Sequence, residues 1–242
     1  MRIDVVPTAE AATAARLADT TVLVVDVLRA STTIITAFTN GCVAIVPVPD
    51  PLEARVRARA WRDTVLLAGE RRGEPIPGFD IGNSPVDMTR ERVAGRTILF
   101  TTSNGTRALL AARGARAVGV AGFVNLGAAA VWARAEGRAI AVLCSGERGR
   151  LSLEDHVCAG LLVDRLLGEH PDADLTGDAT AALDAGRGYA KDVGRLREDS
   201  PWARHLVARG RGGDVAACLR LDVSTLVPRY LPDVDKVVSG PR

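Results

Sequence analysis

Residues 22–28 read VLVVDVL, and residues 29–33 continue with RASTT. A run of β-branched residues that ends in polar ones is typical of a strand buried on both faces. We expect this strand to be followed by a helix at residues 34–39, with Ser31 or Thr32 as its N-cap. A strand that leads directly into a helix favours an α/β fold.

The same alternation of apolar strand and alanine-rich helix continues along the chain. An apolar run at residues 43–48 follows the first helix so closely that we predict a right-handed βαβ unit. Further strands are predicted at residues 64–68, 97–102, 117–120 and 139–143, and further helices at 106–112, 126–135, 153–167 and, as one or two pieces, 202–219. The prediction is an α/β fold in three layers, a largely parallel or mixed sheet sandwiched between helices.

The length of 242 residues suits one domain, or two similar lobes at residues 1–125 and 126–242. Residues 223–238 hold Pro228 and Pro232, so we expect this tail to form an edge strand or a wrapping arm. An arm of this kind can join two copies of a chain, and a homodimer is therefore among the expected partners.

Composition excludes several classes of partner. The formal net charge is +2 and aromatic residues make up 4% of the chain, so we expect no nucleic-acid binding. No apolar run approaches ~20 residues, so we expect no membrane span. The four cysteines form no CxxC pair and the three histidines are not at zinc spacing, which favours reduced thiols and a cytoplasmic protein.

Polar side chains follow four of the predicted strands. In chain order these residues are Asp26 and Arg29, then Glu70, then Ser103 and Asn104, then Ser145 and Glu147. Ligands of open α/β sheets bind beyond the carboxyl ends of the strands. We therefore predict that these residues meet at one edge of the sheet and bind a phosphate group and a hard cation.

Asp26 stands inside an apolar run, where an ionised carboxylate is costly unless it is paired or bound to a metal. The alternative is an aspartate that caps a loop or pairs with Arg29. The turn after it places Arg29, Ser31 and Thr32 at a helix N-terminus, which is typical of an anion site. Plain N-capping by Ser31 is the other interpretation.

The loop at residues 69–85 is long and rich in glycine and proline. Its carboxylates, Glu70, Glu74 and Asp80, are ligands that suit Mg²⁺. Asn83 and Ser84 close this loop. The turn Ser103-Asn104-Gly105-Thr106 repeats the strand-to-helix design, and Gly105 permits an oxyanion to approach the backbone closely.

Several catalytic motifs are absent. The chain has no GxxxxGK[ST] loop, no GxSxG elbow and, with Leu28 in place of a second aspartate, no DxD motif. Cys144 and Arg150 fit the spacing Cys-x5-Arg, but Glu147 between them would repel both a thiolate and a phosphate. Ser152 and Asp155 form a predicted capping box at the start of the helix at residues 153–167. Glu154 and Asp155 are interpreted either as site residues or as dipole partners of this helix start, and His156 as a surface or packing residue.

Four stretches resemble the 2-phosphosulfolactate phosphatase (ComB-like) family. They are DVLRASTT (26–33), GERRGEPIPGFDIGNSP (69–85), TTSNGTRAL (101–109) and SGERGRLSLEDHVCAG (145–160). They occur in the order of the family and lie between residues ~20 and ~165. Beyond residue 171 the resemblance rests on Cys218, Asp222 and Val227-Pro228.

The resemblance implies a Mg²⁺-dependent phosphatase that acts on 2-phosphosulfolactate, the phosphate ester of a small anionic 2-hydroxy acid, in coenzyme M biosynthesis. On the residues that match, we predict catalytic roles for Asp26, Glu70 and Glu147, and Mg²⁺ ligation by these three and Asp80. The predicted substrate-binding residues are Arg29, Ser31, Thr32, Asn83, Ser84, Ser103, Asn104, Gly105, Thr106 and Arg148. Either Arg148 or Arg71 would bind the carboxylate or sulfonate of the substrate.

Two other functions remain open from the sequence. One is a regulatory protein that binds a phosphorylated metabolite without turnover. The other is a structural or interaction subunit in which the polar strand ends only cap loops. A metal-dependent rate of phosphate release would separate the enzyme from both.

Overall fold

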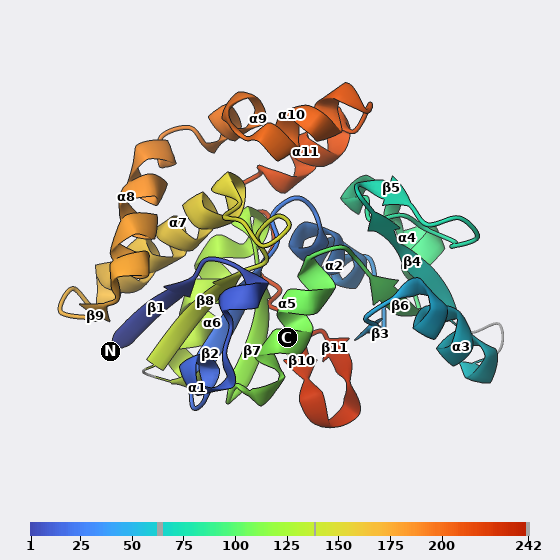
Figure 1. Ribbon diagram of the computed structural model, residues 1–242, viewed down its shortest axis with the longest axis horizontal. Helices are drawn as coiled ribbons and strands as arrows, with labels where there is room; N and C mark the ends of the chain where they lie inside the picture. The colour runs from blue at the N-terminus through green and yellow to red at the C-terminus, as the bar shows by residue number, and fades with distance from the viewer. Residues whose placement is uncertain (62–64, 138, 241–242) are drawn as a thin grey trace.

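The computed structural model describes residues 1–61, 65–137 and 139–240. These residues form an 11-stranded mixed sheet with helices packed on both faces, which confirms the predicted three-layer α/β fold (Figure 1). In their order across the sheet, the strands are β5 (Glu74–Pro75), β4 (Val65–Arg71), β6 (Thr97–Thr101), β3 (Ala44–Pro47), β11 (Lys236–Val238), β10 (Arg229–Leu231), β7 (Ala117–Ala121), β2 (Thr21–Val25), β8 (Ala139–Cys144), β1 (Arg2–Val6) and β9 (Asp174–Leu175).

The helices fill the connections between these strands. In chain order they are α1 (Ala14–Leu17), α2 (Ala30–Thr39), α3 (Pro51–Trp61), α4 (Arg90–Val93), α5 (Gly105–Ala111), α6 (Leu126–Glu136), α7 (Leu153–Glu169), α8 (Gly177–Tyr189), α9 (Leu196–Asp199), α10 (Pro201–Ala208) and α11 (Gly212–Cys218). A short 3-10 turn, η3 (Pro85–Asp87), closes the glycine-rich loop. Most predicted elements are confirmed within a few residues; Thr64, predicted to start a strand, lies outside the described residues.

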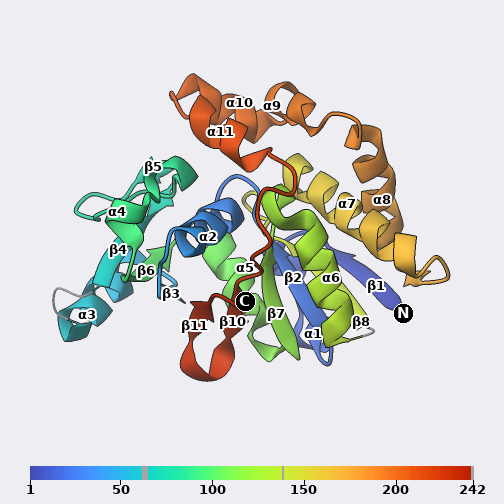
Figure 2. The ribbon, with the colours of Figure 1, turned by 180° about the vertical axis from the view of Figure 1, so that it is seen from behind.

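Strand β2 lies between β7 and β8 and is buried on both faces. Leu23 and Val25 pack into one core with α6 and α7, which cover one face of the sheet in Figure 2. Val22 and Val24 pack into the opposite core with α2 and α5. A strand covered on both faces needs an uninterrupted apolar run, which explains the sequence VLVV. The strand ends earlier than predicted, so that Asp26 stands directly beyond it.

The predicted βαβ unit is wrong. Strand β2 pairs with β7 and β8, whereas β3 pairs with β6 in the other half of the sheet. Helix α2 therefore connects the two halves rather than two neighbouring strands. Sequence proximity favoured adjacent strands, but the pairing partners of both strands come from segments much later in the chain.

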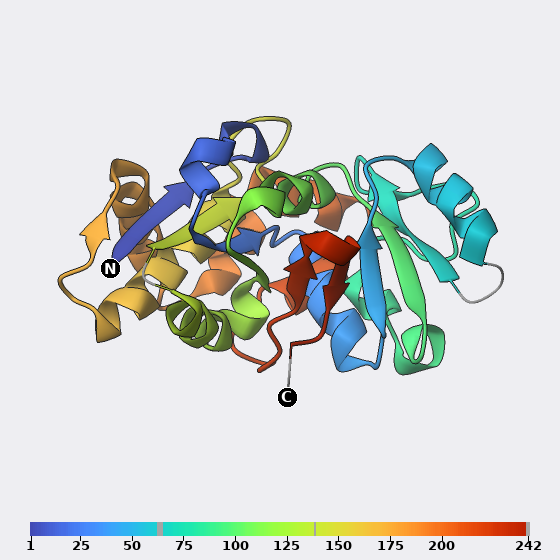
Figure 3. The same cartoon turned by 90° about the horizontal axis from the view of Figure 1, so that it is seen from below.

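The prediction for the C-terminal tail is also wrong. Strands β10 and β11 form an antiparallel hairpin that pairs with β7 on one side and with β3 on the other. Figure 3 shows this hairpin in the middle of the sheet, between the two halves. The tail thus supplies central strands and joins the halves, while β5 and β9 are the edges.

The hairpin also reverses the strand direction. Strands β1, β2, β7 and β8 are mutually parallel, and so are β3, β4 and β6, but three successive antiparallel pairings separate the groups. In a flat sheet the carboxyl ends of the two groups would lie at opposite edges. Because sheets twist and long loops follow β4 and β6, residues from both groups can still meet.

The two lobes considered from the sequence do not match the strand pairing. Strands β1 and β2 both pair with β8, so a boundary near residue 125 would separate paired strands. Helices α10 and α11 lie across the junction of the two halves of the sheet (Figure 1). A single domain over residues 1–242 stays a prediction.

Candidate active site

A small cavity of about 50 Å³ lies where the loops after β2, β4, β6 and β8 come together. It is lined by Asp26, Leu28, Arg29, Glu70, Arg72, Gly73, Asn83, Ser103, Asn104, Glu147, Arg148 and Trp202. Seven of the residues predicted for catalysis or substrate binding beside Asp26 are therefore brought together, from four segments far apart in the sequence. We call this cavity the acidic–basic pocket, because both carboxylates and arginines line its wall.

Asp26 is a buried carboxylate of the pocket wall. Its Oδ1 accepts a hydrogen bond from the backbone N–H of Ala30 at 3.1 Å. Burial, assisted by the nearby charge of Glu70, raises the pKa of Asp26 from 3.8 to about 7. Gly105 packs directly against it, since a Cβ on Gly105 would lie 2.5 Å from Asp26 Oδ2. A carboxylate held at this depth is suited to a cation.

Two turns of the same design contribute to the pocket wall. In the first, Arg72 and Gly73 connect β4 to β5, and both have positive φ angles (56° and 86°). In the second, Arg148 and Gly149 (51° and 73°) connect Glu147 to Arg150, which exchange two backbone hydrogen bonds. Positive φ at both central residues defines the type I′ turn of tight hairpins.

Each turn presents one glutamate and one arginine to the pocket. The exposed side chain of Arg72 forms no hydrogen bond or ion pair with any described residue, and that of Arg148 lies 3.5 Å from Glu147. Both arginines are therefore available to a ligand. Burial raises the pKa of the half-buried Glu147 carboxyl, while Arg148 partly offsets this.

Glu70 fixes the first turn. Its Oε2 accepts the N–H of Gly73 at 2.7 Å, and its Oε1 accepts the N–H of Ser103 at 2.7 Å. Ser103 Oγ also donates to Glu70 and accepts the N–H of Arg72. Glu70 lies inside β4, not after it as predicted, and its carboxylate ties the β4 turn to the β6 loop.

Arg29 does not pair with Asp26. Its Nη1 forms an ion pair with Asp214 at 2.5 Å, and its Nη2 donates to the carbonyl of Gly73 at 2.8 Å. Both partners of the ion pair are almost fully buried. Asp214 also accepts a hydrogen bond from Ser84 Oγ at 2.6 Å, which explains why Ser84 does not cap η3.

Six predicted site residues do not line the pocket. Asp80 is exposed and accepts the N–H of Leu67 at 2.8 Å, because the loop doubles back along β4. The structure therefore places Asp80 outside the pocket, and its predicted place in the site is corrected. The other five, which are buried and serve the local fold, are Ser31, Thr32, Ser84, Gly105 and Thr106.

The N-terminus of α2 is not a free anion site. The helix begins at Ala30, and Arg29 is the N-cap, so neither Ser31 nor Thr32 caps it. Asp26 accepts the N–H groups of both Ala30 and Ser31, and Ser31 Oγ accepts the N–H of Asp26 in return. The first donors of the helix thus orient Asp26. Thr32 lies in a separate groove beside Ile35.

Further acids support the pocket from behind. Asp155 accepts the N–H of Val27 at 2.8 Å and the Oγ of Ser145 at 3.0 Å, so it joins the ends of β2 and β8. Burial raises the pKa of Asp155 well above its ordinary value, and that of Glu154 is raised for the same reason. Asp155 is thus more than a dipole partner, although Ser152 does cap α7 as predicted.

The oxygen donors of the pocket can be compared with the needs of Mg²⁺. Among residues 1–61, 65–137 and 139–240, no three histidine, cysteine or acidic side chains are grouped so as to enclose a metal. Mg²⁺ commonly keeps several waters and takes one or two carboxylates together with phosphate oxygens. Asp26 and Glu147 line the pocket, and Asn83 Oδ1 is buried there without a hydrogen-bond partner. This donor set fits a partly hydrated Mg²⁺.

Cysteine chemistry is excluded by the surroundings of Cys144. Its side chain is buried, and burial raises the pKa of its thiol well above the ordinary value of 9.0. A thiol of this kind is not the reactive thiolate that the Cys-x5-Arg spacing would require. All four cysteines are free and buried.

Sequence reasoning missed three residues around the pocket. Arg72, rather than Arg71, faces the cavity, since Arg71 is bonded to Thr101 Oγ1 and to the Glu70 carbonyl. The signal was the dipeptide Arg72-Gly73, a type I′ turn sequence between two extended stretches. Trp202 and Asp214 had no comparable signal, because they come from a helical region without a motif.

The protein has a three-layer α/β fold, and carboxylates and arginines together line its pocket. Residues 6–232 match the family described as 2-phosphosulpholactate phosphatase. Three relatives carry the name "Probable 2-phosphosulfolactate phosphatase". The protein of Symbiobacterium thermophilum is 39% identical over 90% of this chain and 94% of its own; that of Gloeobacter violaceus is 41% identical over 85% and 86%; that of Thermotoga petrophila is 36% identical over 88% and 90%.

The chain belongs to the 2-phosphosulpholactate phosphatase family, and the predicted resemblance is confirmed. The match extends well beyond residue 171, where the sequence motifs end, and it includes α10, α11 and β10. In the described part of the chain, no helix is both long and apolar enough to cross a membrane.

Proposed function

We propose that this protein is a Mg²⁺-dependent phosphatase that hydrolyses the phosphate ester of 2-phosphosulfolactate to sulfolactate and phosphate. The observation that carries the proposal is the acidic–basic pocket, which combines a buried carboxylate, Asp26, with arginines from separate segments. Family membership and the names of the relatives support the reaction and the substrate.

The oxygen donors at the pocket favour Mg²⁺ as the cofactor. Asp26 and Glu147, with Asn83 Oδ1, would hold the ion, and water and phosphate oxygens would complete its shell. When bound, Mg²⁺ neutralises charge on the phosphoryl group. It would also stabilise the ionised form of Asp26, which burial disfavours in the free protein.

The side chains of the pocket then have separate tasks. Arg29 and Asn104 provide N–H donors to the phosphoryl oxygens, where negative charge is concentrated. Glu147 is only half-buried and can orient the attacking water and accept its proton. Phosphoryl transfer depends mainly on positioning and charge neutralisation, so a site without a covalent nucleophile is sufficient.

The acid end of the substrate requires space and positive charge. A second hollow of about 530 Å³ adjoins the pocket and shares Glu147, Arg148 and Trp202 with it. Trp202 and His205 stack with ring centroids 4.8 Å apart, and they form a wall of this hollow. Because the pocket of about 50 Å³ is small, we place the carboxylate and sulfonate where the pocket meets this hollow, near Arg148, which lines both, and Arg72, which lines the pocket.

Phosphate release from 2-phosphosulfolactate, measured with Mg²⁺ and with excess EDTA, tests the proposed reaction. We expect turnover only with Mg²⁺, and no release in either condition would overturn the proposal.

A variant with Arg72→Ala and Arg148→Ala tests where the carboxylate and sulfonate of the substrate bind. We expect its KM to rise about 10-fold or more for 2-phosphosulfolactate but little for p-nitrophenyl phosphate, which lacks both acid groups. An equal change for both esters would contradict this assignment.

A further inference from the structure

Asp214 lies in the first turn of α11, behind the pocket and not on its wall. Its side chain is only 1% exposed. One of its oxygens pairs with Arg29 Nη1, and the other accepts a hydrogen bond from Ser84 Oγ. A carboxylate is stable at this depth only when it is paired and hydrogen-bonded, and Asp214 meets both conditions.

Arg29 is the pocket residue at the other end of this ion pair. Its guanidinium is held by Asp214 from α11 and by the carbonyl of Gly73 from the β4 turn. A guanidinium has five N–H donors, and these contacts engage one on each Nη atom. No other described residue accepts a hydrogen bond from this guanidinium, so the remaining donors can serve an oxyanion at the pocket. Two fixed contacts on a planar group leave it a single orientation.

Helices α10 and α11 are attached to both sides of the pocket. Trp202 Nε1 donates to the carbonyl of Leu28 at 3.0 Å, and Arg209 pairs with Glu74 at 2.7 Å. Asp214 contacts both Arg29, the residue before α2, and Ser84, the residue before η3. The two helices therefore bridge the halves of the molecule at the place where the pocket forms (Figure 1).

We propose that Asp214 is a positioning residue, which holds the Arg29 guanidinium in the orientation that binds phosphoryl oxygens. Through this contact, helices α10 and α11 become part of the active site, although no sequence motif marks them. The inference rests on the proposed function, because that function identifies the bound anion as the phosphoryl group of the substrate. The geometry of the ion pair itself does not depend on the substrate.

Charge alone and positioning predict opposite effects of removing Asp214. If Asp214 acted only through its charge, its loss would leave Arg29 uncompensated, and the pocket would bind an anion more tightly. If Asp214 orients Arg29, its loss frees the guanidinium to turn away, and anion binding weakens. The direction of the change in phosphate affinity therefore separates a charge effect from a positioning effect. A residue that only stabilised the fold would leave the phosphate affinity of the folded variant unchanged.

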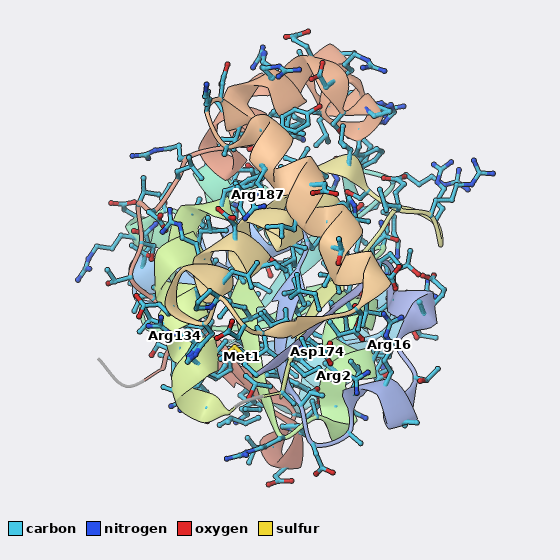
Figure 4. All side chains as sticks on the ribbon, turned by 90° about the vertical axis from the view of Figure 1, so that its left-hand side faces the viewer. Met1, Arg2, Arg16, Arg134, Asp174 and Arg187 are labelled. Atoms are coloured by element: carbon cyan, nitrogen blue, oxygen red, sulfur yellow. The ribbon has the colours of Figure 1, made fainter. Side chains whose placement is uncertain are left out.

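Inorganic phosphate is the probe, and its binding to the full chain is measured by titration calorimetry. We compare Asp214→Asn, which removes the charge with little change in shape, and Ser84→Ala, which loosens Asp214 without changing any charge. The matched control is Asp4→Asn. Asp4, on β1, pairs with Arg16 at 2.6 Å. Figure 4 views the side of the molecule that lies at the left of Figure 1, and Arg16 is labelled there. Thermal unfolding is recorded for every variant.

We expect Asp214→Asn to bind phosphate about 10-fold more weakly than the wild type, and Ser84→Ala a few-fold more weakly. Asp4→Asn should lose stability but keep the wild-type affinity. Equal or tighter phosphate binding by folded Asp214→Asn, or by Ser84→Ala if the first variant does not fold, would overturn the proposal. So would a wild-type protein that binds no phosphate. A wild type that binds phosphate but releases none from the ester would instead overturn the proposed function.

Discussion

Replacing Asp26 with Asn is expected to remove activity and, at neutral pH, to stabilise the protein. The pKa of the Asp26 carboxyl in the folded chain is about 7, against an ordinary value of 3.8, mainly because the carboxyl is buried. Each pKa unit corresponds to about 1.4 kcal/mol, so keeping this group ionised above pH 7 costs the folded state up to roughly 4 kcal/mol. Asparagine has nearly the same shape and carries no charge.

The direction of the pH dependence follows from the raised pKa. Between about pH 4 and pH 7 the unfolded chain has lost the Asp26 proton while the folded chain keeps it. The free energy of unfolding of the wild type therefore falls as the pH rises through this window, and this contribution is constant above it. The Asn variant lacks this contribution. Its advantage should be absent near pH 4 and full near pH 8, where it corresponds to a Tm gain of roughly 10 °C.

The assay is thermal unfolding of both proteins at pH 5 and pH 8 in EDTA, together with phosphate release in Mg²⁺. We expect the Asn variant to lose at least about 100-fold in turnover, because a ligand of the cation is lost. Asp80→Asn is the control, since Asp80 is exposed and outside the pocket, and its turnover should be unchanged. Turnover by Asp26→Asn close to that of the wild type, or a Tm difference that is the same at both pH values, would refute the reasoning.

Two further predictions concern the packing of the pocket. Gly105→Ala should lower turnover, and in a urea titration it should lower the free energy of unfolding by about 1–3 kcal/mol, because the new Cβ would lie 2.5 Å from Asp26 Oδ2. Its control is Gly168→Ala, in α7 with open space around it, which should raise the free energy of unfolding by about 0.5–1 kcal/mol in the same titration. Glu70→Gln should cost about 1–3 kcal/mol and reduce kcat/KM, because an amide NH₂ would meet the N–H of Gly73 or of Ser103. An unchanged urea midpoint for Glu70→Gln would show that the turn does not need this carboxylate.

Local patterns in the sequence predicted the individual elements well. The apolar run before Asp26 became β2, and Ser152 caps α7 as expected, because strand burial and helix capping depend on neighbouring residues. Such features follow from short-range physical chemistry that a single sequence records. Gly105 was predicted to let an oxyanion of the ligand approach the backbone, whereas the group that lies against it is the carboxylate of Asp26.

Long-range pairing was not predictable in the same way. The hairpin of β10 and β11 takes its place in the sheet from β3 and β7, and nothing within the tail specifies these partners. Contrary to the prediction, the carboxyl ends of the strands do not all lie at one edge of the sheet, because the two parallel groups of strands run in opposite directions. The pocket forms nevertheless, because the loops after β4 and β6 approach the end of β2.

The errors among the predicted site residues have local causes. Asp80 has a carboxylate suited to Mg²⁺, but a backbone N–H of β4 uses it. Arg29 was weighed as a partner of Asp26, whereas its partner is Asp214, 185 residues away in the sequence. Residue type therefore indicated the chemistry of the site, while the assignment of each contact required the fold.

The most direct test of the central claim is a crystal structure of the wild-type protein with Mg²⁺ and inorganic phosphate. We expect one cation coordinated by Asp26, with the phosphate next to the cation and within hydrogen-bond distance of Arg29. Phosphate bound in another groove, or a cation that leaves Asp26 without a contact, would contradict it.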